Sequence, residues 1–151
     1  MEVAEYYKMA QVEDRMWYYR SLHGHFHRLL HARFGSGPCD LLDAGCGSGG
    51  LIHYLQSRAP EWRITGIDLS PLACRLAGRR CRAAIIEGSV TALPFDGPAF
   101  DAVLSADVLY ELNEPAAALR EFHRCLRPGG RVVVNVPAYR WLWSYHDVAV
   151  R

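Results

Sequence analysis

Short apolar runs alternate with longer amphipathic segments along most of the chain. The apolar runs are bounded by glycine, proline or polar residues and predict five strands, at residues 40–44, 63–67, 83–87, 100–106 and 131–136. The segments between them repeat apolar positions three or four residues apart and predict helices at residues 51–57, 71–80 and 115–126. In the last helix, the side chains expected to face inward are Ala117, Leu119, Phe122 and Leu126. This alternation favours an α/β fold in one domain, a parallel sheet with helices on both faces.

Residues 1–34 precede the first strand and read as helical, ahead of a glycine- and proline-containing linker at residues 35–38. Apolar and aromatic side chains recur there at helical spacing: Trp17, Tyr18, Leu22, Phe26, Leu29, Leu30 and Phe34. His23, His27 and His31 share one face of the helix, with a spacing that a metal site can use. No nearby cysteine or carboxylate completes a ligand set, so we expect a solvated polar face and no metal.

A glycine-rich loop at residues 41–50 joins the first strand to the helix after it. Gly45, Gly47 and Gly49 alternate there, so the backbone can turn sharply and a ligand can lie directly against it. The following helix directs free N–H groups toward the same place. Asp68 ends the second strand, where a carboxylate can accept both hydroxyls of a ribose. The loop therefore predicts a nucleotide-like cofactor, although its spacing alone also fits the dinucleotide fingerprint.

Further motifs follow the glycine loop in order. After Asp-x-Gly-x-Gly-x-Gly from Asp43 come Gly-Ile-Asp-Leu-Ser from Gly66, Leu-Pro-Phe from Leu93, Phe-Asp-Ala-Val from Phe100 and Leu-Arg-Pro-Gly-Gly from Leu126. Over residues 39–137 this series resembles class I S-adenosylmethionine-dependent methyltransferases of the type 11 group. The resemblance implies S-adenosyl-L-methionine as cofactor and a Rossmann-like sheet of strand order 3-2-1-4-5. It divides the single domain into an N-terminal helical lid (1–37), a cofactor-binding core (38–137) and a C-terminal tail (138–151).

The resemblance also implies a set of cofactor-binding residues. They are Asp43, Gly45, Cys46, Gly47, Gly49, Asp68, Leu69, Ser89, Val90, Ala106, Tyr7 and Trp17. Family members usually carry an aspartate where Ser89 stands, and that aspartate bonds the adenine amino group, which serine can replace only in part. The N-terminal helices of such enzymes lie over the cofactor, so Tyr7, Trp17 and Tyr18 are expected either as walls of the pocket or as plain core.

Methyl transfer requires mainly that the acceptor atom be held in line behind the S–CH₃ bond, away from water. Where the acceptor is a hydroxyl, a base helps to remove its proton. Candidate catalytic residues are Glu111, at a position where relatives often have histidine, His146 and Tyr18, with Tyr110 as a further candidate. For each of them we favour a structural or substrate-binding role over base catalysis. The expected reaction is O- or N-methylation of a small molecule.

Composition narrows the class of partner. A formal net charge of +1 gives no support for a nucleic-acid partner, and no apolar run approaches the ~20 residues that span a bilayer. The N-terminus has no basic region followed by an apolar one, and the five cysteines lack a metal-like spacing. We therefore expect a cytoplasmic protein with reduced cysteines. Its expected partner is a small-molecule substrate, without nucleic acid or membrane.

Two other functions stay open. A nicotinamide-dependent oxidoreductase using NAD or NADP would share the glycine loop and Asp68. Against it stand Asp43, the Leu-Arg-Pro-Gly-Gly motif and the lack of room for a catalytic domain. A catalytically inactive remnant that binds S-adenosylmethionine is the other possibility, because the family fold has two more strands after the fifth and only a short stretch follows Pro137.

Without those strands the fifth strand would be a sheet edge, which invites pairing with another chain. An apolar patch would lie beside it, formed by Trp141, Leu142, Trp143 and Tyr145. Either the tail folds back over its own edge, or two chains join. We favour the monomer over the homodimer, because Pro137 directs the chain away from the strand. In both arrangements His146 and Asp147 should lie near the acceptor mouth.

Overall fold

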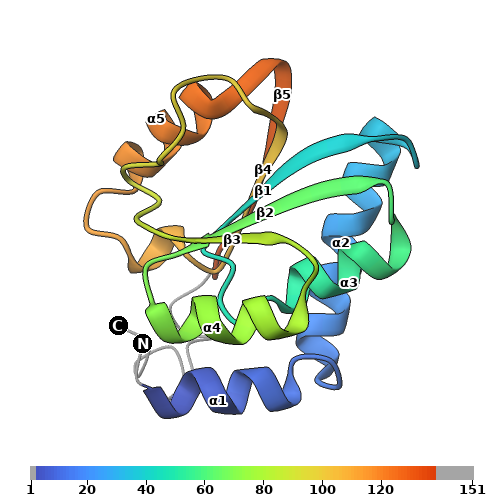
Figure 1. Cartoon of the computed structure of the whole chain (residues 1–151), viewed down its shortest axis with the longest axis vertical. Helices are drawn as coiled ribbons and strands as arrows, with labels where there is room; N and C mark the ends of the chain where they lie inside the picture. The colour runs from blue at the N-terminus through green and yellow to red at the C-terminus, as the bar shows by residue number, and fades with distance from the viewer. Residues whose placement is uncertain (1–2, 139–151) are drawn as a thin grey trace.

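The strands form one parallel sheet of five strands. The computed structural model describes residues 3–138, with side chains from residue 6 onward. The strands are β1 (Cys39–Ala44), β2 (Trp62–Asp68), β3 (Ala84–Glu87), β4 (Phe100–Ala106) and β5 (Leu126–Asn135). They lie in the order β3-β2-β1-β4-β5 and pair in parallel throughout (Figure 1). The predicted strand order is therefore confirmed.

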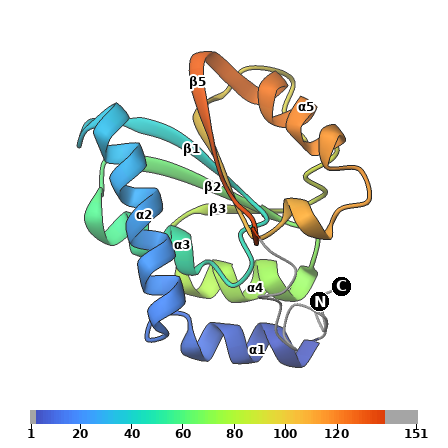
Figure 2. The ribbon, with the colours of Figure 1, turned by 180° about the vertical axis from the view of Figure 1, so that it is seen from behind.

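Helices cover both faces of this sheet, as predicted. They are α1 (Val3–Val12), α2 (Trp17–Phe34), α3 (Gly50–Arg58), α4 (Pro71–Arg80) and α5 (Pro115–Cys125), with a short 3₁₀ helix η1 (Leu109–Glu111). Side chains of α2, α3 and α4 pack into one core cluster, and those of α5 pack into the other, on the opposite face. Seen from behind in Figure 2, α2 runs beside α3, while α1 packs against α4.

The central strand β1 shows why continuous apolar runs predicted the strands. Leu41 belongs to the core under α2 and α3, whereas its neighbour Leu42 belongs to the core under α5, and both are fully buried. Successive side chains of a strand point to opposite faces. A strand covered on both faces must therefore be apolar at nearly every position.

Two predicted details of the helices differ from the structure. The helical stretch predicted over residues 1–34 is two helices, separated by a break at residues 13–16. In α5, Phe122 is buried as predicted, but the inward placement of Leu119 is wrong, because this side chain is 44% exposed. Ala118 and Cys125 are buried instead. The three successive alanines at 116–118 give the apolar pattern no clear phase, which explains the error.

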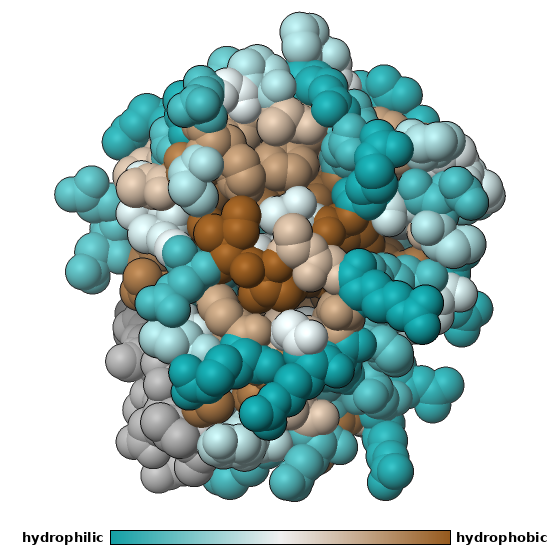
Figure 3. Space-filling view, viewed as in Figure 1, coloured by the Kyte–Doolittle hydropathy of each residue, from teal (hydrophilic) through white to brown (hydrophobic). Residues whose placement is uncertain are grey.

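The sheet has β3 and β5 at its edges. Figure 3 shows an apolar area over β3, between α4 and α5, bordered by hydrophilic side chains. The other edge, β5, begins earlier than predicted, and its pairing with β4 shifts register between Phe100 and Ala102. Gly129 lies within this irregularity with φ of 80°. The predicted patch at residues 141–145 lies outside the described residues.

No helix within residues 3–138 is long and apolar enough to cross a membrane. In the same part of the chain all five cysteines are free, and no cluster of three or more histidine, cysteine or carboxylate side chains could hold a metal ion.

Candidate functional site

A cavity of about 850 Å³ opens where the carboxyl ends of the central strands meet the N-terminal helices. Its walls come from α1, α2, the glycine loop after β1, and the segments that follow β2, β3, β4 and β5. Ligands of open parallel sheets bind at this edge, where the strand order reverses between β1 and β4. The fold therefore places the predicted glycine loop in one cavity with Asp107 and Glu111, which follow β4.

The glycine loop needs its glycines for backbone geometry. Gly45, Gly47 and Gly49 have φ of 89°, 52° and 82°, in the left-handed region that favours glycine. The N–H groups of Gly45 and Cys46 both donate to the carbonyl of Ile67, which ties the loop to the end of β2. A Cβ at Gly45 would lie 2.2 Å from a Val108 methyl group, so this position admits no side chain.

Asp68 accepts hydrogen bonds from the backbone of the glycine loop and of the segment after β2. Its Oδ2 accepts the N–H of Gly47 at 2.9 Å, and its Oδ1 accepts the N–H of Ser70 at 2.9 Å. Ser70 in turn caps α4 by accepting the N–H of Ala73, as the Ser-Pro pair predicts. Each carboxylate oxygen can accept more than one hydrogen bond, so Asp68 retains acceptor capacity toward the cavity that it lines.

Asp43 is a buried carboxylate in the wall of the cavity. It is 2% exposed, and its Oδ2 has no hydrogen-bond partner among the described residues. Burial, followed by the nearby charges of Glu13 and Asp68, raises the pKa of Asp43 to about 8. Asp43 is therefore mostly protonated at neutral pH, and a ligand that brings positive charge close to it would favour its ionised form.

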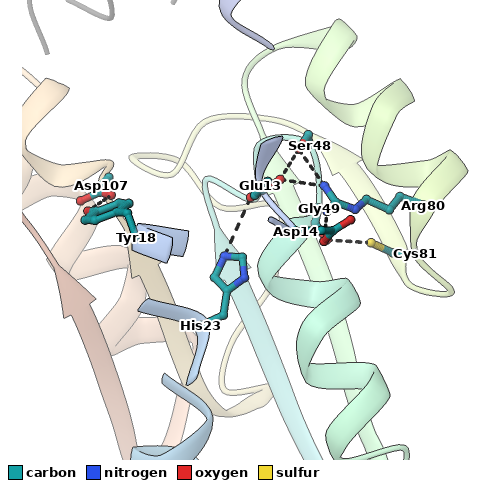
Figure 4. A network of polar contacts seen from close by, with 9 residues as sticks. All are labelled: Glu13, Asp14, Tyr18, His23, Ser48, Gly49, Arg80, Cys81 and Asp107. Atoms are coloured by element: carbon teal, nitrogen blue, oxygen red, sulfur yellow. Dashed lines mark hydrogen bonds and ion pairs between the residues drawn. The ribbon is translucent and has the colours of Figure 1, made fainter. Parts of the chain in front are cut away.

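Glu13 fastens the N-terminal helices to the glycine loop (Figure 4). Its Oε2 accepts the hydroxyl of Ser48 at 2.5 Å and Nη1 of Arg80 at 2.7 Å. Arg80 also pairs with Asp14, so one guanidinium holds both carboxylates of the turn after α1. Burial is the main cause that raises the pKa of Glu13. The network joins the turn after α1 to the loop and to α4.

His23 lies behind this network, with Nε2 3.9 Å from Oε1 of Glu13. The side chain is buried, so the predicted solvated polar face is wrong at this position, although His31 is exposed. Burial, and then the charge of Arg80, lower the pKa of His23 to about 4. His23 is therefore a neutral, packed side chain.

A second group of polar side chains lines the cavity, and its members come from α2, from the segment after β4 and from the end of β5. Tyr18 of α2 donates its hydroxyl hydrogen to Oδ2 of Asp107 at 2.8 Å. Asn135, at the end of β5, donates from Nδ2 to Oδ1 of Asp107 at 2.6 Å. Burial, and then the charge of Asp107, raise the pKa of Tyr18 above its ordinary value. Tyr18 is consequently a hydrogen-bond donor at neutral pH.

Glu111 stands at the rim of the cavity, at the end of η1. The residue is partly exposed, and partial burial of its carboxyl is the main cause that raises its pKa. Asp68 and Asp107 add repulsion in the same direction. Tyr110 lines the cavity beside it. His146, the remaining predicted catalytic residue, lies outside the described residues.

Most of the predicted cofactor residues line the cavity: Asp43, Gly45, Cys46, Gly47, Asp68, Leu69, Ser89, Val90 and Ala106. Gly49 does not, because it faces α4, where a Cβ would lie 3.0 Å from Ala77. Tyr7 and Trp17 are outside the lining and are 50% and 76% exposed, so neither the pocket wall nor the core placement holds for them. The lining aromatics of the N-terminal helices are Tyr6, Tyr18 and Tyr19.

Sequence reasoning missed Glu13 and Asn135. Asn135 is a polar residue at the carboxyl end of an apolar strand, and the carboxyl ends of parallel strands lie at the ligand-binding edge of the sheet. This position could have identified it as a site residue. Glu13 and Arg80 are 67 residues apart, and nothing local connects them. Ser89 is a predicted cofactor residue, and its hydroxyl bonds both the side-chain hydroxyl and the backbone N–H of Thr91.

Comparison with known proteins identifies the family. A family model described as a methyltransferase domain matches residues 42–134, more than half of the chain. The chain therefore belongs to this family of class I S-adenosylmethionine-dependent methyltransferases. The residues at the cavity fit that cofactor, since Asp43 offers an orphaned carboxylate oxygen to its cationic groups and Gly47 leaves the loop bare of side chain.

Two curated relatives are similar over the core of the fold. Demethylmenaquinone methyltransferase of Thermus thermophilus is 37% identical over 102 residues, which cover 64% of this chain and 46% of that protein. Malonyl-[acyl-carrier protein] O-methyltransferase of Hahella chejuensis is 37% identical over 101 residues, which cover 65% of this chain and 36% of that protein. The chain thus spans less than half the length of these relatives.

A solved structure from Methanococcus maripaludis, described as a proposed S-adenosyl-L-methionine-dependent methyltransferase, has the same fold. Its TM-score is 0.77 at 21% identity, over 87% of this chain and 62% of that one.

Proposed function

We propose that this domain transfers the methyl group of S-adenosylmethionine to a small-molecule acceptor, by O- or N-methylation with in-line displacement. One observation carries the proposal. The glycine loop and Asp68, suited to a cofactor, share a cavity with Asp107 and Glu111, which are suited to an acceptor. Family membership supports the same cofactor.

The cofactor end is assigned to the loop and the two buried carboxylates. The backbone at Gly45 and Gly47 carries no side chain toward the cavity, so the methionine portion can lie directly against the loop. Asp68 accepts the ribose hydroxyls with the acceptor capacity that Gly47 and Ser70 leave. Asp43 is assigned to the positively charged groups of the cofactor. When bound, the cofactor supplies an electrophilic methyl group on a sulfonium.

We assign the acceptor end to Asp107 and Glu111, which follow β4, and to Asn135 at the end of β5. They hold the acceptor in line with the methyl group, and positioning of this kind can lower a barrier by roughly 7–11 kcal/mol. The N-terminal helices, fastened by Glu13 and Arg80, keep water from the reacting atoms. A general base is optional, and the candidates among the described residues, Glu111, Tyr18 and Tyr110, all line the cavity.

Release of S-adenosylhomocysteine in the presence of acceptors tests the proposal. Phenols, catechols, amines and sugars would be offered in turn with S-adenosylmethionine, and the product read by mass. Product that depends on both the acceptor and Asp68 supports methyl transfer. Cofactor binding without product from any acceptor favours the inactive remnant, and binding of NAD in place of S-adenosylmethionine favours the oxidoreductase.

We propose a monomer for the assembly state, as the sequence favours. Val132, Val134 and Val136, on or just after the edge strand β5, are exposed at 39%, 38% and 44%, so this edge carries apolar surface. The preference for a monomer rests on Pro137, which is expected to direct the chain away from the strand. Light scattering on a sizing column tests this, and a single dimer at micromolar concentration contradicts it.

A further inference from the structure

The chain passes from β3 to β4 through residues 88–99, which form neither helix nor strand. The first three residues of this loop, Gly88, Ser89 and Val90, line the cavity. Loops of about this length without secondary structure of their own are uncommon in compact domains, and they are usually either functional or disordered. The contacts that hold this loop in place therefore bear on the wall of the cavity.

Two side chains of α5 bind the backbone of this loop. Oε2 of Glu121 accepts the N–H of Leu93 at 2.8 Å. Arg124 donates from Nη2 to the carbonyl of Leu93 at 3.0 Å and from Nη1 to the carbonyl of Phe95. Backbone groups outside helices and strands need partners of this kind. One pair of side chains thus satisfies three backbone groups of the loop.

Glu121 and Arg124 also bind each other, three residues apart on α5. Nε of Arg124 lies 2.8 Å from Oε1 of Glu121, and Nη2 lies 2.6 Å from Oε2, which is the bidentate arrangement of a guanidinium and a carboxylate. The hydrogen bonds from Arg124 are the first cause that lowers the pKa of Glu121 to about 2. The pair is therefore ionised at neutral pH, and its planar geometry fixes the direction of the bonds to the loop.

A short turn connects these bonds to the wall of the cavity. The N–H of Ala92 donates to the carbonyl of Ser89 at 3.1 Å, and Leu93 follows this turn directly. Leu93 is buried and belongs, together with Val90, to the core cluster under α5. The position of Leu93 therefore sets the position of Ser89 and Val90.

The place of this wall in the sheet indicates which part of the cofactor it meets. The proposed function puts the methionine portion at the loop after β1 and the ribose at Asp68, which ends β2. β3 lies beside β2 on the side away from β1, and the N–H of Gly88 donates to the carbonyl of Asp68 at 2.9 Å. The base is attached to the ribose, so residues 88–90 lie where the base would bind.

We propose that Glu121 and Arg124 are positioning residues for cofactor binding, which hold residues 88–90 in place against the base of S-adenosylmethionine. The inference rests on the proposed function and adds to it two residues that do not line the cavity. A wall that is already ordered binds its ligand without a further loss of conformational entropy. Where the loop is released, only the fraction of chains with the wall in place can bind, and the apparent dissociation constant rises accordingly.

Calorimetry with two ligands tests this role without any acceptor. Arg124→Met keeps the apolar stem of the side chain but removes every donor, so it should weaken S-adenosylhomocysteine by about tenfold. Methylthioadenosine shares the base and the ribose but lacks the amino-acid end, and it should lose affinity by the same factor. Both titrations are made at a temperature where circular dichroism shows the variant to be folded. A pair that served only the stability of the fold would leave both affinities unchanged there.

Two further variants control this comparison. Arg124→Lys keeps the positive charge but not the planar fork, so it should restore part of the affinity and lose about threefold. Arg120→Ala removes an exposed arginine of the same helix that lies outside the cavity lining and has no side-chain partner within residues 3–138. It should leave both affinities unchanged. If Arg124→Met does not fold, Arg124→Lys decides, and full affinity in that variant would overturn the inference.

Hydrogen exchange reports on the loop directly. In the ligand-free chain the amides of Ala92 and Leu93 should exchange faster in Arg124→Met than in the unaltered chain, and S-adenosylhomocysteine should restore part of their protection. Unchanged exchange at these amides, unchanged affinity in folded Arg124→Met, or a loss that methylthioadenosine does not share would each overturn the inference. Failure of the unaltered chain to bind S-adenosylhomocysteine would instead overturn the proposed function, and this inference with it.

Discussion

The carboxylate of Glu13 occupies the space that a side chain at Gly50 would need. A Cβ built on Gly50 would lie 2.0 to 2.3 Å from the carboxyl atoms of Glu13. Gly50 is the first residue of α3, and Glu13 lies in the turn between α1 and α2. The last glycine of the loop therefore serves the N-terminal helices as well as the loop, because it lets a buried, paired carboxylate approach the backbone.

Gly50→Ala should destabilise the chain even though alanine favours helix by ~1 kcal/mol. The Glu13 carboxylate would have to move away from Ser48 and Arg80, and we expect a net loss on the order of 1–3 kcal/mol. Gly78→Ala in α4 is the matched control, because a Cβ there meets nothing within 4 Å. Urea unfolding measures both, and stabilisation by both substitutions would contradict this account.

Asp43→Asn should change how stability depends on pH. The folded pKa of Asp43 is about 8, above its ordinary value, so the folded chain keeps a proton that the unfolded chain releases. This carboxyl therefore costs stability as pH rises from ~4 to ~8. Relative to the unaltered chain, Asp43→Asn should gain roughly 2–4 kcal/mol on going from pH 5 to pH 8. An equal difference at the two pH values would contradict the assignment.

Asp68→Ala should weaken S-adenosylhomocysteine by more than tenfold, since charge-assisted bonds contribute ~1.5–3 kcal/mol each. It should also lower stability, because Asp68 holds the N–H groups of Gly47 and Ser70. Glu87→Ala is the control, an exposed carboxylate that ends the neighbouring strand and does not line the cavity. Calorimetry measures both variants, and lost stability with unchanged affinity would show that Asp68 serves the fold alone.

Local chemistry in the sequence predicted the sheet and the glycine loop. The short apolar runs, the Ser70–Pro71 helix start and the alternating glycines each depend on neighbouring residues, and all of them hold in the structure. The side-chain partners of the N-terminal helices could not be predicted in the same way. Tyr18 meets Asp107 across 89 residues of sequence, and its neighbour Trp17 points outward. Which aromatic residue faces the cavity depends on how α2 packs, and the helical pattern alone does not determine that.

The most direct test is a thermal shift of the unaltered chain with S-adenosylhomocysteine and, separately, with NAD. A ligand at ~100 times its dissociation constant adds ~2.7 kcal/mol to the folded state. The melting temperature should rise with S-adenosylhomocysteine and not with NAD. In Gly47→Val the rise should disappear, because a side chain there enters the cavity at a backbone with positive φ. A rise with NAD alone, or an undiminished rise in Gly47→Val, would contradict the assignment of this cavity to S-adenosylmethionine.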